Sequence, residues 1–332
     1  MIEHDIIVIG TSAGGVDALK ELVSGLPQDM PAALFVVIHT SPTGPGILPQ
    51  VLGRSGTLTV VNAVDKDEIR YGHMYVAPPD HHLLVEEGCV RLSKGPKENR
   101  HRPAIDPLFR SAAYTYGSRV VGVVLTGLLD DGTAGMLVIK TCGGTTIVQD
   151  PNDAVYADMP RNVLEHVEVD YCLSLSQIAS HLVEITKTPF EKKAIFPVPG
   201  KVMIESGIPK MKGATAENME KIGNPSPFTC PECSGNLWEI KDGKLFRFRC
   251  RQGHAYSPSS LLTAQSDTVE SALWAALRAM EENADFYQRM AVKERELNNT
   301  MLAKQYEENA KETEVHIETL LHVVLKGKKP KM

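Results

Sequence analysis

The chain has 332 residues, of which 42% are hydrophobic, and a formal net charge of −6 at pH 7. This length exceeds one ordinary domain, so we expect a soluble protein of more than one domain. The negative charge excludes a general attraction to nucleic acid, although 327–332 form a small basic tail. No apolar run reaches the roughly 18 residues of a membrane span, and no secretory leader precedes the first strand. We therefore expect a cytoplasmic protein without membrane insertion.

The N-terminal stretch passes from a buried strand into a helix through a glycine-rich turn. The turn Gly10-Thr11-Ser12-Ala13-Gly14 fits G-x-S-x-G, the nucleophile elbow that exposes a serine hydroxyl. It fails the dinucleotide fingerprint G-x-G-x-x-G, because Ser12 stands where a glycine is needed. A tight turn without chemistry remains an alternative for this stretch alone. The first N–H groups of such a helix suit an anion or a developing oxyanion.

Two more buried strands end in side chains that suit acid–base chemistry. The run 33–38 ends at His39, and the run 119–125 leads into a glycine-rich turn that contains Asp130 and Asp131. Parallel strands gather reacting groups beyond their carboxyl ends. Alone, His39 could be structural and either aspartate could cap the next helix. Together with Ser12, these side chains favour a serine hydrolase with Ser12 as nucleophile, His39 as general base and Asp131 as orienting acid.

The first half of the chain predicts an α/β fold. Helical patterns cover 106–116, 133–141, 159–166 and 175–186, and a further apolar strand covers 145–149. Short alternating runs within 57–94, separated by Gly and Pro, indicate hairpins, so we expect the sheet to gain antiparallel strands there. The expected fold is a doubly wound, mainly parallel sheet with an antiparallel hairpin portion.

Several motifs follow one another in a fixed order within residues 3–187. They are 9–15, Ile38-His39, Tyr75-Val76-Ala77-Pro78, Asn99-Arg100-His101-Arg102-Pro103, Leu125-Thr126-Gly127, Asp131-Gly132 with Ala134-Gly135-Met136, Gln149-Asp150-Pro151 and Met159-Pro160-Arg161. In these motifs the chain resembles the catalytic domain of the bacterial chemotaxis protein-glutamate methylesterase and glutaminase family. The chain order Ser, His, Asp also differs from that of α/β-hydrolases, which run Ser, Asp/Glu, His.

The resemblance implies hydrolysis of γ-glutamyl methyl esters on a methylated chemoreceptor or receptor-like protein, and deamidation of certain glutamines, by Ser12, His39 and Asp131. No cofactor is expected for catalysis. Backbone N–H groups of Ala13 and Leu128 are expected to hold the oxyanion. Within the basic loop 95–103, the resemblance assigns Arg100 and Arg102 to a glutamate-rich receptor surface.

Two features depart from the family pattern. Family members commonly carry a response-regulator receiver before the catalytic domain, whereas here the catalytic domain is expected at 1–187 with no receiver in front of Ser12. Control by phosphorylation of a receiver is therefore not expected. Leu128 and Leu129 also stand where the family commonly has Met and a small residue, which affects the turn before Asp131.

A second, smaller module is expected at 226–257, after a Pro-, Lys- and Gly-rich linker at 188–225. Three of the six cysteines gather here, which suggests a metal site rather than disulfides. Four residues have the spacing of a structural zinc ribbon, namely Cys230, Cys233, Cys250 and His254. The runs 237–241 and 245–249 indicate a hairpin between the ligand pairs, and one structural zinc ion is expected because so short a module has little core of its own.

Residues 258–326 have a helical pattern with two apolar stripes. Asn298-Asn299 is a plausible turn between two antiparallel helices, although one long helix would also satisfy the pattern. Such helices could bind a partner helix or self-associate, or they could pack on the rest of the chain.

Two functions therefore compete. The first is the serine esterase, and the alternative is a binding or scaffold protein of a signalling complex that uses the zinc ribbon and the helical region. Ser12, His39 and Asp131 side chains too far apart to connect would favour the scaffold.

Overall fold

The computed structural model describes residues 4–188, 198–212 and 214–326. The chain divides into two compact units, Met1–Leu261 and Leu262–Met332, and each is described here by itself. Among the described residues, no helix is both long enough and apolar enough to cross a bilayer.

The first unit is built on a seven-stranded sheet in which every neighbouring pair is parallel. Its strands, in spatial order, are β3 (Thr59–Asn62), β4 (His73–Val76), β2 (Ala33–Ile38), β1 (Ile6–Thr11), β7 (Val120–Val124), β8 (Thr145–Gln149) and β9 (Tyr171–Leu173). After β1 the chain places β2, β3 and β4 on one side of this strand, and it then returns to place β7 on the other side of β1. This reversal is a topological switch point, where open α/β sheets place their ligands.

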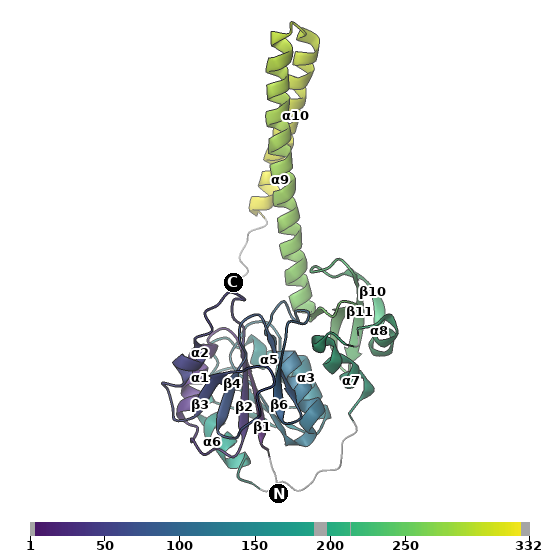
Figure 1. Cartoon of the computed structure of the whole chain (residues 1–332). Coiled ribbons are helices and arrows are strands. Elements are labelled where there is room, and N and C mark those ends of the chain that lie inside the picture. Colours follow the sequence, from purple (N-terminus) through teal and green to yellow (C-terminus); the bar gives the residue numbers. More distant parts are fainter. Residues whose placement is uncertain (1–3, 189–197, 213, 327–332) are drawn as a thin grey trace. The chain divides into compact units, whose positions relative to one another are not determined.

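Helices cover both faces of this sheet, because its central strands are buried on both sides. One face packs on α1 (Gly15–Ser24), α2 (Leu48–Leu52) and α6 (Leu175–Ile185). The other packs on α3 (Ile105–Tyr116), which a 3₁₀ turn (Gly117–Arg119) follows, on α4 (Thr133–Thr141) and on α5 (Asp158–His166). Figure 1 shows α1 and α6 on one side of the strands and α3 and α5 on the other. The predicted doubly wound fold is confirmed.

The expected antiparallel hairpin is present, but it does not join the main sheet. It consists of β5 (His82–Glu86) and β6 (Cys89–Ser93), which form a separate two-stranded sheet. The other two runs predicted as hairpin strands are β3 and β4, and they pair in parallel. β3 is the last strand of the sheet and is partly exposed, whereas β4 lies between β3 and β2 and is mostly buried. An alternating pattern carries no information on strand direction.

The stretch predicted as a linker contains helices. They are α7 (Gly200–Gly207), a 3₁₀ turn (Ile208–Lys210) and α8 (Ala216–Ile222). These helices are too short to show periodicity, and α8 buries only Met219 and Ile222, against Ile240 of the next sheet. Part of the predicted linker lies outside the described residues.

The module that follows is a four-stranded antiparallel sheet. Its strands are β10 (Asn224–Thr229), β11 (Asn236–Asp242), β12 (Leu245–Cys250) and β13 (Ala255–Tyr256). The hairpin predicted between the two ligand pairs is β11–β12, and Gly243 at its turn has φ 61°.

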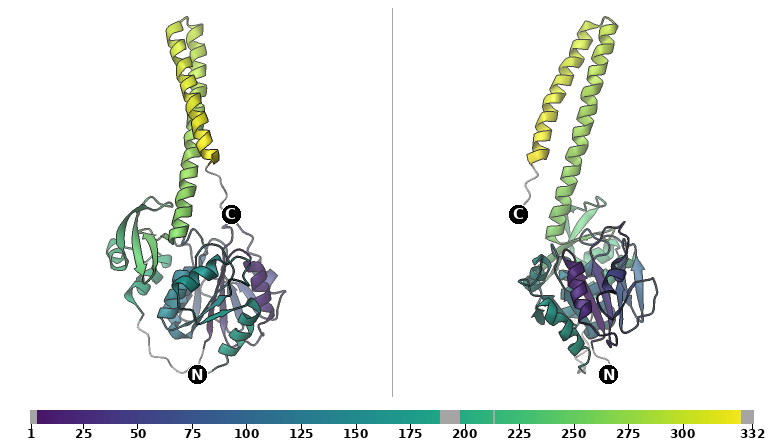
Figure 2. Two further views of the ribbon diagram at one scale, coloured as in Figure 1. Left: turned by 180° about the vertical axis from the view of Figure 1, so that it is seen from behind. Right: turned by 90° about the vertical axis from the view of Figure 1, so that its left-hand side faces the viewer.

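The C-terminal helices form a hairpin. Helix α9 (Pro258–Glu296) begins in the first unit and continues into the second, where α10 (Thr300–Lys326) follows it. The two helices run side by side in opposite directions in Figure 2, and Arg295 pairs with Glu307 at 2.6 Å and Gln288 bonds Glu314 at 2.9 Å. The turn predicted at Asn298-Asn299 lies between them, so the hairpin alternative is correct for this region.

Candidate active site and metal centre

The side chains of Ser12, His39 and Asp131 form one hydrogen-bonded chain beyond the carboxyl ends of β1, β2 and β7. His39 Nδ1 lies 3.1 Å from Ser12 Oγ, and His39 Nε2 lies 2.7 Å from Asp131 Oδ2. An ionised Asp131 can only accept, so Nε2 carries the ring proton and Nδ1 is left to accept the Ser12 hydroxyl proton. The structure thus connects the three residues that the sequence selected.

Asp131 is buried and surrounded by donors. Burial alone would raise the pKa of this carboxyl, but hydrogen bonds from His39, the Ile105 N–H and Asn99 outweigh burial and hold the pKa below its usual range. The Ile105 N–H lies 2.7 Å from Oδ2, and the Gly132 N–H lies 2.9 Å from Oδ1. Asp131 is therefore ionised at neutral pH and its two oxygens are fixed in direction.

The turn that carries Ser12 is held against the turn after β7. The Ser12 N–H donates to the Thr126 carbonyl at 3.1 Å, and Gly14 adopts φ 75°, which favours glycine. A Cβ on Gly127 would come within 3.0 Å of Ser12 Cβ, so the two turns are in close contact. Among the described residues, the N–H groups of Ala13 and Leu128, the predicted oxyanion donors, have no backbone carbonyl as acceptor.

His101 lies flat on the catalytic imidazole. The ring centroids of His39 and His101 are 3.7 Å apart and their planes differ by 6°. Burial and the neighbouring His39 lower the pKa of His101 to about 4, so this ring is neutral at neutral pH. The stack fixes the plane of the His39 ring without adding a second positive charge to it.

The two arginines predicted to bind substrate differ in their surroundings. Arg102 bonds Asp80 Oδ1 through Nε at 2.9 Å and Nη2 at 2.6 Å, and it also bonds the Lys94 and Gly95 carbonyls. Its donors are thus directed to the protein, which argues against a substrate contact. Arg100 is half-buried and close enough to His101 to lower its pKa, and its substrate role stays a prediction.

An apolar pocket lies at the end of β2, and its lining includes Ile38 and Thr40, the residues on either side of His39 in the chain. It has a volume of about 440 Å³. Its lining includes Val16, Ile38, Ile47, Val51 and Pro79. Since Ile38 directly precedes His39, an apolar segment next to a reacting group could occupy this pocket.

Cys230, Cys233, Cys250 and His254 form a group that could hold a metal ion, with all ligand atoms within 4.8 Å of one another. Cys233 and Cys250 sulfurs are 3.6 Å apart, and His254 Nδ1 lies 3.5 Å from Cys250 Sγ and 3.7 Å from Cys230 Sγ. In a tetrahedral zinc site, bonds of about 2.3 Å to sulfur and 2.0–2.1 Å to nitrogen put ligand atoms roughly 3.5–3.8 Å apart. The donor set and its spacing therefore fit zinc.

Sequence reasoning missed three residues that contact or neighbour the triad, namely Asn99, His101 and Asp106. Asn99 and His101 belong to a motif that supported the family resemblance, but only its arginines were assigned a role. The position of Asn99 and His101 in that motif is the sequence feature that could have indicated a role in the site. Asp106 was read only as the start of a helix, and nothing in the local sequence indicates that it lies beside Asp131.

Comparisons with known proteins agree with this geometry. The CheB methylesterase family model matches residues 7–182. A Leptospira interrogans relative is 37% identical over 193 residues, which cover 58% of this chain and all of that relative. A Thermotoga maritima relative, named protein-glutamate methylesterase/protein-glutamine glutaminase, is 38% identical over 188 residues, and the match covers 55% of each chain.

The fold is similar to a solved structure as well. The crystal structure of the Thermotoga maritima CheB methylesterase catalytic domain superposes with a TM-score of 0.53 at 37% identity, over 55% of this chain and 99% of that one. The family model covers more than half of the chain, and its match ends before the cysteine-containing module. The chain belongs to the CheB methylesterase family.

Proposed function

We propose that this protein hydrolyses methyl esters of glutamate side chains in chemoreceptor-like proteins, with Ser12 as nucleophile, His39 as general base and acid, and Asp131 as orienting acid. The observation that carries the proposal is the continuous hydrogen-bonded chain from Ser12 Oγ through His39 to the ionised Asp131. A connected triad also argues against the alternative of a scaffold without catalysis. Cytoplasmic location is part of the proposal.

The first half of the reaction forms an acyl-enzyme. Ser12 Oγ attacks the γ-carbonyl carbon of the ester and gives its proton to His39 Nδ1. The N–H groups of Ala13 and Leu128 hold the resulting oxyanion. When the intermediate collapses, the imidazolium returns this proton to the leaving methoxide, and methanol departs.

The second half releases the product. A water molecule gives a proton to His39 Nδ1 and attacks the acyl carbon, and the bond to Ser12 Oγ breaks as that oxygen regains the proton. Asp131, 2.7 Å from Nε2, stabilises the imidazolium in both halves. The same path deamidates glutamine when ammonia leaves in place of methanol, so we include glutaminase activity.

The other regions have proposed roles that serve the esterase. Cys230, Cys233, Cys250 and His254 hold one structural zinc ion, which replaces a core that this module lacks. The apolar pocket beside His39 accepts apolar side chains of the receptor segment, and Arg100 faces its carboxylates. The catalytic domain ends near residue 187, and 258–326 meets a helical partner or a second copy.

Replacing the nucleophile tests the proposal. For Ser12→Ala we expect the release of methanol from a methylated chemoreceptor fragment to fall at least about a thousandfold, because no other group in the triad can attack the carbonyl. Ser24→Ala is the matched control, since Ser24 lies on α1, is exposed and bonds only the Glu21 carbonyl. If Ser12→Ala demethylates the receptor at the wild-type rate, the assignment is wrong.

A further inference from the structure

The last residues of the first unit lie against the catalytic domain. We call residues 255–260, which contain β13 and the start of α9, the clamp segment. The Asn99 N–H donates to the Ala255 carbonyl at 2.8 Å, and the Ala255 N–H donates to the Lys97 carbonyl at 3.3 Å. Glu98 and Ala255 thus form a parallel β-bridge, and the loop before α3 extends the sheet of the metal-site module.

The side chain of Asn99 connects the clamp segment to the triad. Its Oδ1 accepts from the Ser257 N–H at 3.0 Å and from Ser260 Oγ at 3.3 Å. Its Nδ2 donates to Asp131 Oδ1 at 2.9 Å and to Asp106 Oδ2 at 3.0 Å. The clamp segment therefore donates to the amide oxygen, and this directs both amide protons to the carboxyl groups of Asp131 and Asp106.

The clamp segment also binds Asp130, the residue before Asp131. Ser257 Oγ donates to Asp130 Oδ1 at 2.6 Å, and Ser259 Oγ lies 2.8 Å from Asp130 Oδ2. Ser257 Oγ also accepts the Ser260 N–H at 3.0 Å, which caps the first turn of α9. Ser260, His39 and Asp131 line one small cavity. The clamp segment thus contacts the Asp130-Asp131 turn both directly and through Asn99.

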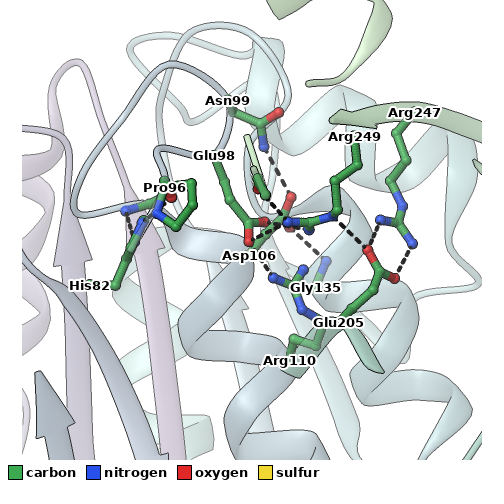
Figure 3. A network of polar contacts seen from close by, with 12 residues as sticks. His82, Pro96, Glu98, Asn99, Asp106, Arg110, Gly135, Glu205, Arg247 and Arg249 are labelled. Atoms are coloured by element: carbon green, nitrogen blue, oxygen red, sulfur yellow. Dashed lines mark hydrogen bonds and ion pairs between the residues drawn. The ribbon is translucent and has the colours of Figure 1, made fainter. Parts of the chain in front are cut away.

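A buried ion network fixes the metal-site module to the catalytic domain (Figure 3). Arg249, at the end of β12 and 0% exposed, bonds both oxygens of Glu98 at 3.0 Å. Arg110 of α3 bonds Glu98 Oε1 at 2.7 Å, and Arg249 Nε lies 3.2 Å from Glu205 of α7. The network places the metal-site module in a fixed position relative to Asn99.

The charges in this network balance. Its acidic members are Glu98, Glu205 and Asp242, and its basic members are Arg110, Arg247 and Arg249. Burial alone would raise the pKa of Glu98, but Arg110 and Arg249 hold it below its usual range. Glu98 is therefore charged at neutral pH beside its two arginines. Removal of either partner would leave a buried charge without its counterion.

We propose that Asn99 is a positioning residue for the Ser12–His39–Asp131 triad, and that the clamp segment sets its orientation. The metal-site module is then a working part of the active site, although it lies beyond the region that the family model matches. This inference rests on the proposed esterase function. In this chain the added module, and not the catalytic domain alone, then orients Asn99 and through it Asp131.

The contribution of Asn99 is to the chemical step of the reaction and not to substrate binding. Asn99 holds Asp131 Oδ1 so that Oδ2 faces His39, and Asp131 acts when the imidazolium forms in the transition state. Loss of this donor therefore lowers kcat and leaves KM within about twofold, because Asn99, 6% exposed, does not reach the substrate.

A double-mutant cycle tests the proposal in the full chain. For Asn99→Gly, which suits the φ of 48°, we expect kcat on a methylated receptor fragment to fall about tenfold to a hundredfold. For Ser260→Ala, which removes the side-chain hydrogen bond to Asn99 Oδ1, we expect a fall of about threefold to tenfold. In the Asn99→Gly background, Ser260→Ala has no further effect, because the Ser260 hydroxyl acts on the triad through Asn99.

Three controls separate this effect from unfolding and from failure of the triad. Ser266→Ala, on an exposed part of α9, leaves kcat unchanged. Bound metal and melting temperature are measured for each variant, and Asn99→Asp repeats the test with a side chain of the same shape. Unchanged kcat in both folded Asn99 variants, or fully additive effects of Asn99→Gly and Ser260→Ala, would overturn the proposal. Wild-type activity in Ser12→Ala would instead refute the esterase assignment.

Discussion

At the scale of single residues, the site keeps one of two neighbouring carboxyl groups charged. Burial and the nearby Asp131 carboxylate raise the pKa of Asp106 to about 8, although the Gly135 N–H donates to it at 2.6 Å. Asp131 receives more donors and stays ionised. The pair therefore carries one negative charge at neutral pH, on the residue that faces His39.

This pair predicts a loss of stability in mild alkali. The pKa of Asp106 in the folded protein, about 8, lies above its ordinary value of 3.8, so its stabilising contribution is complete below pH 4 and is lost as pH rises through 8. Between pH 7 and 9 the free energy of unfolding should fall by about 1 kcal/mol from this group. Thermal melting across this range measures the fall.

Asp106→Asn provides the comparison, because it removes the titration. Its absolute stability differs from wild type, but its melting temperature should change less between pH 7 and 9. An equally steep decrease in the variant would show that another group is responsible.

The roles of individual side chains could be predicted from the sequence only for residues that follow a predicted strand. Ser12, His39 and Asp131 each follow an apolar run, and a parallel sheet brings such positions to one edge. Asn99 and Asp106 lie in a loop and at a helix start, so their contacts with Asp131 depend on tertiary packing. Arg102 has the charge of a substrate ligand, but its pairing with Asp80 is not visible in the sequence.

At the scale of elements, the contact between the turns after β1 and β7 sets the position of Ser12, the proposed nucleophile. A Cβ on Gly127 would lie 2.1 Å from Met159 Sδ and 3.0 Å from Ser12 Cβ. Met159 is fully buried, so it has little room to move. For Gly127→Ala we therefore expect Ser12 to be displaced and kcat to fall about tenfold or more.

Steady-state kinetics with a melting curve for each variant check this expectation. Gly200→Ala is the matched control, since nothing lies within 4 Å of its added Cβ, and it should keep wild-type kcat. Wild-type kcat in Gly127→Ala would mean that the two turns can separate without affecting Ser12.

Buried elements were predictable and edge elements were not. The strands β1, β2, β7 and β8 are fully buried, and their apolar runs identify them without ambiguity. The edge strand β3 and its neighbour β4 alternate like hairpin strands, so their direction was predicted wrongly. Helix α7 has only eight residues, too few to show a helical pattern, so Glu205 and its part in the ion network could not be predicted.

At the scale of the whole molecule, the proposed metal ligands adjoin the segment that contacts the triad. His254 directly precedes Ala255, whose carbonyl accepts the Asn99 N–H, and Cys250 ends the strand that carries Arg249. The family comparison could not predict this link, because its match ends before the module. If the module depends on its metal for folding, the metal also supports the orientation of Asn99.

Cys233→Ser tests this dependence in the full chain. Cys233 supplies one of the four ligand atoms, so the variant should bind metal more weakly, and its module should melt at a lower temperature than that of wild type. Cys172→Ser, which changes an exposed thiol outside the group, should keep wild-type metal content and melting. Metal analysis of the purified proteins and calorimetry give the two measurements. Full metal content in Cys233→Ser would remove this residue from the ligand set, whereas metal loss without any change in melting would show that the module folds on its protein contacts alone.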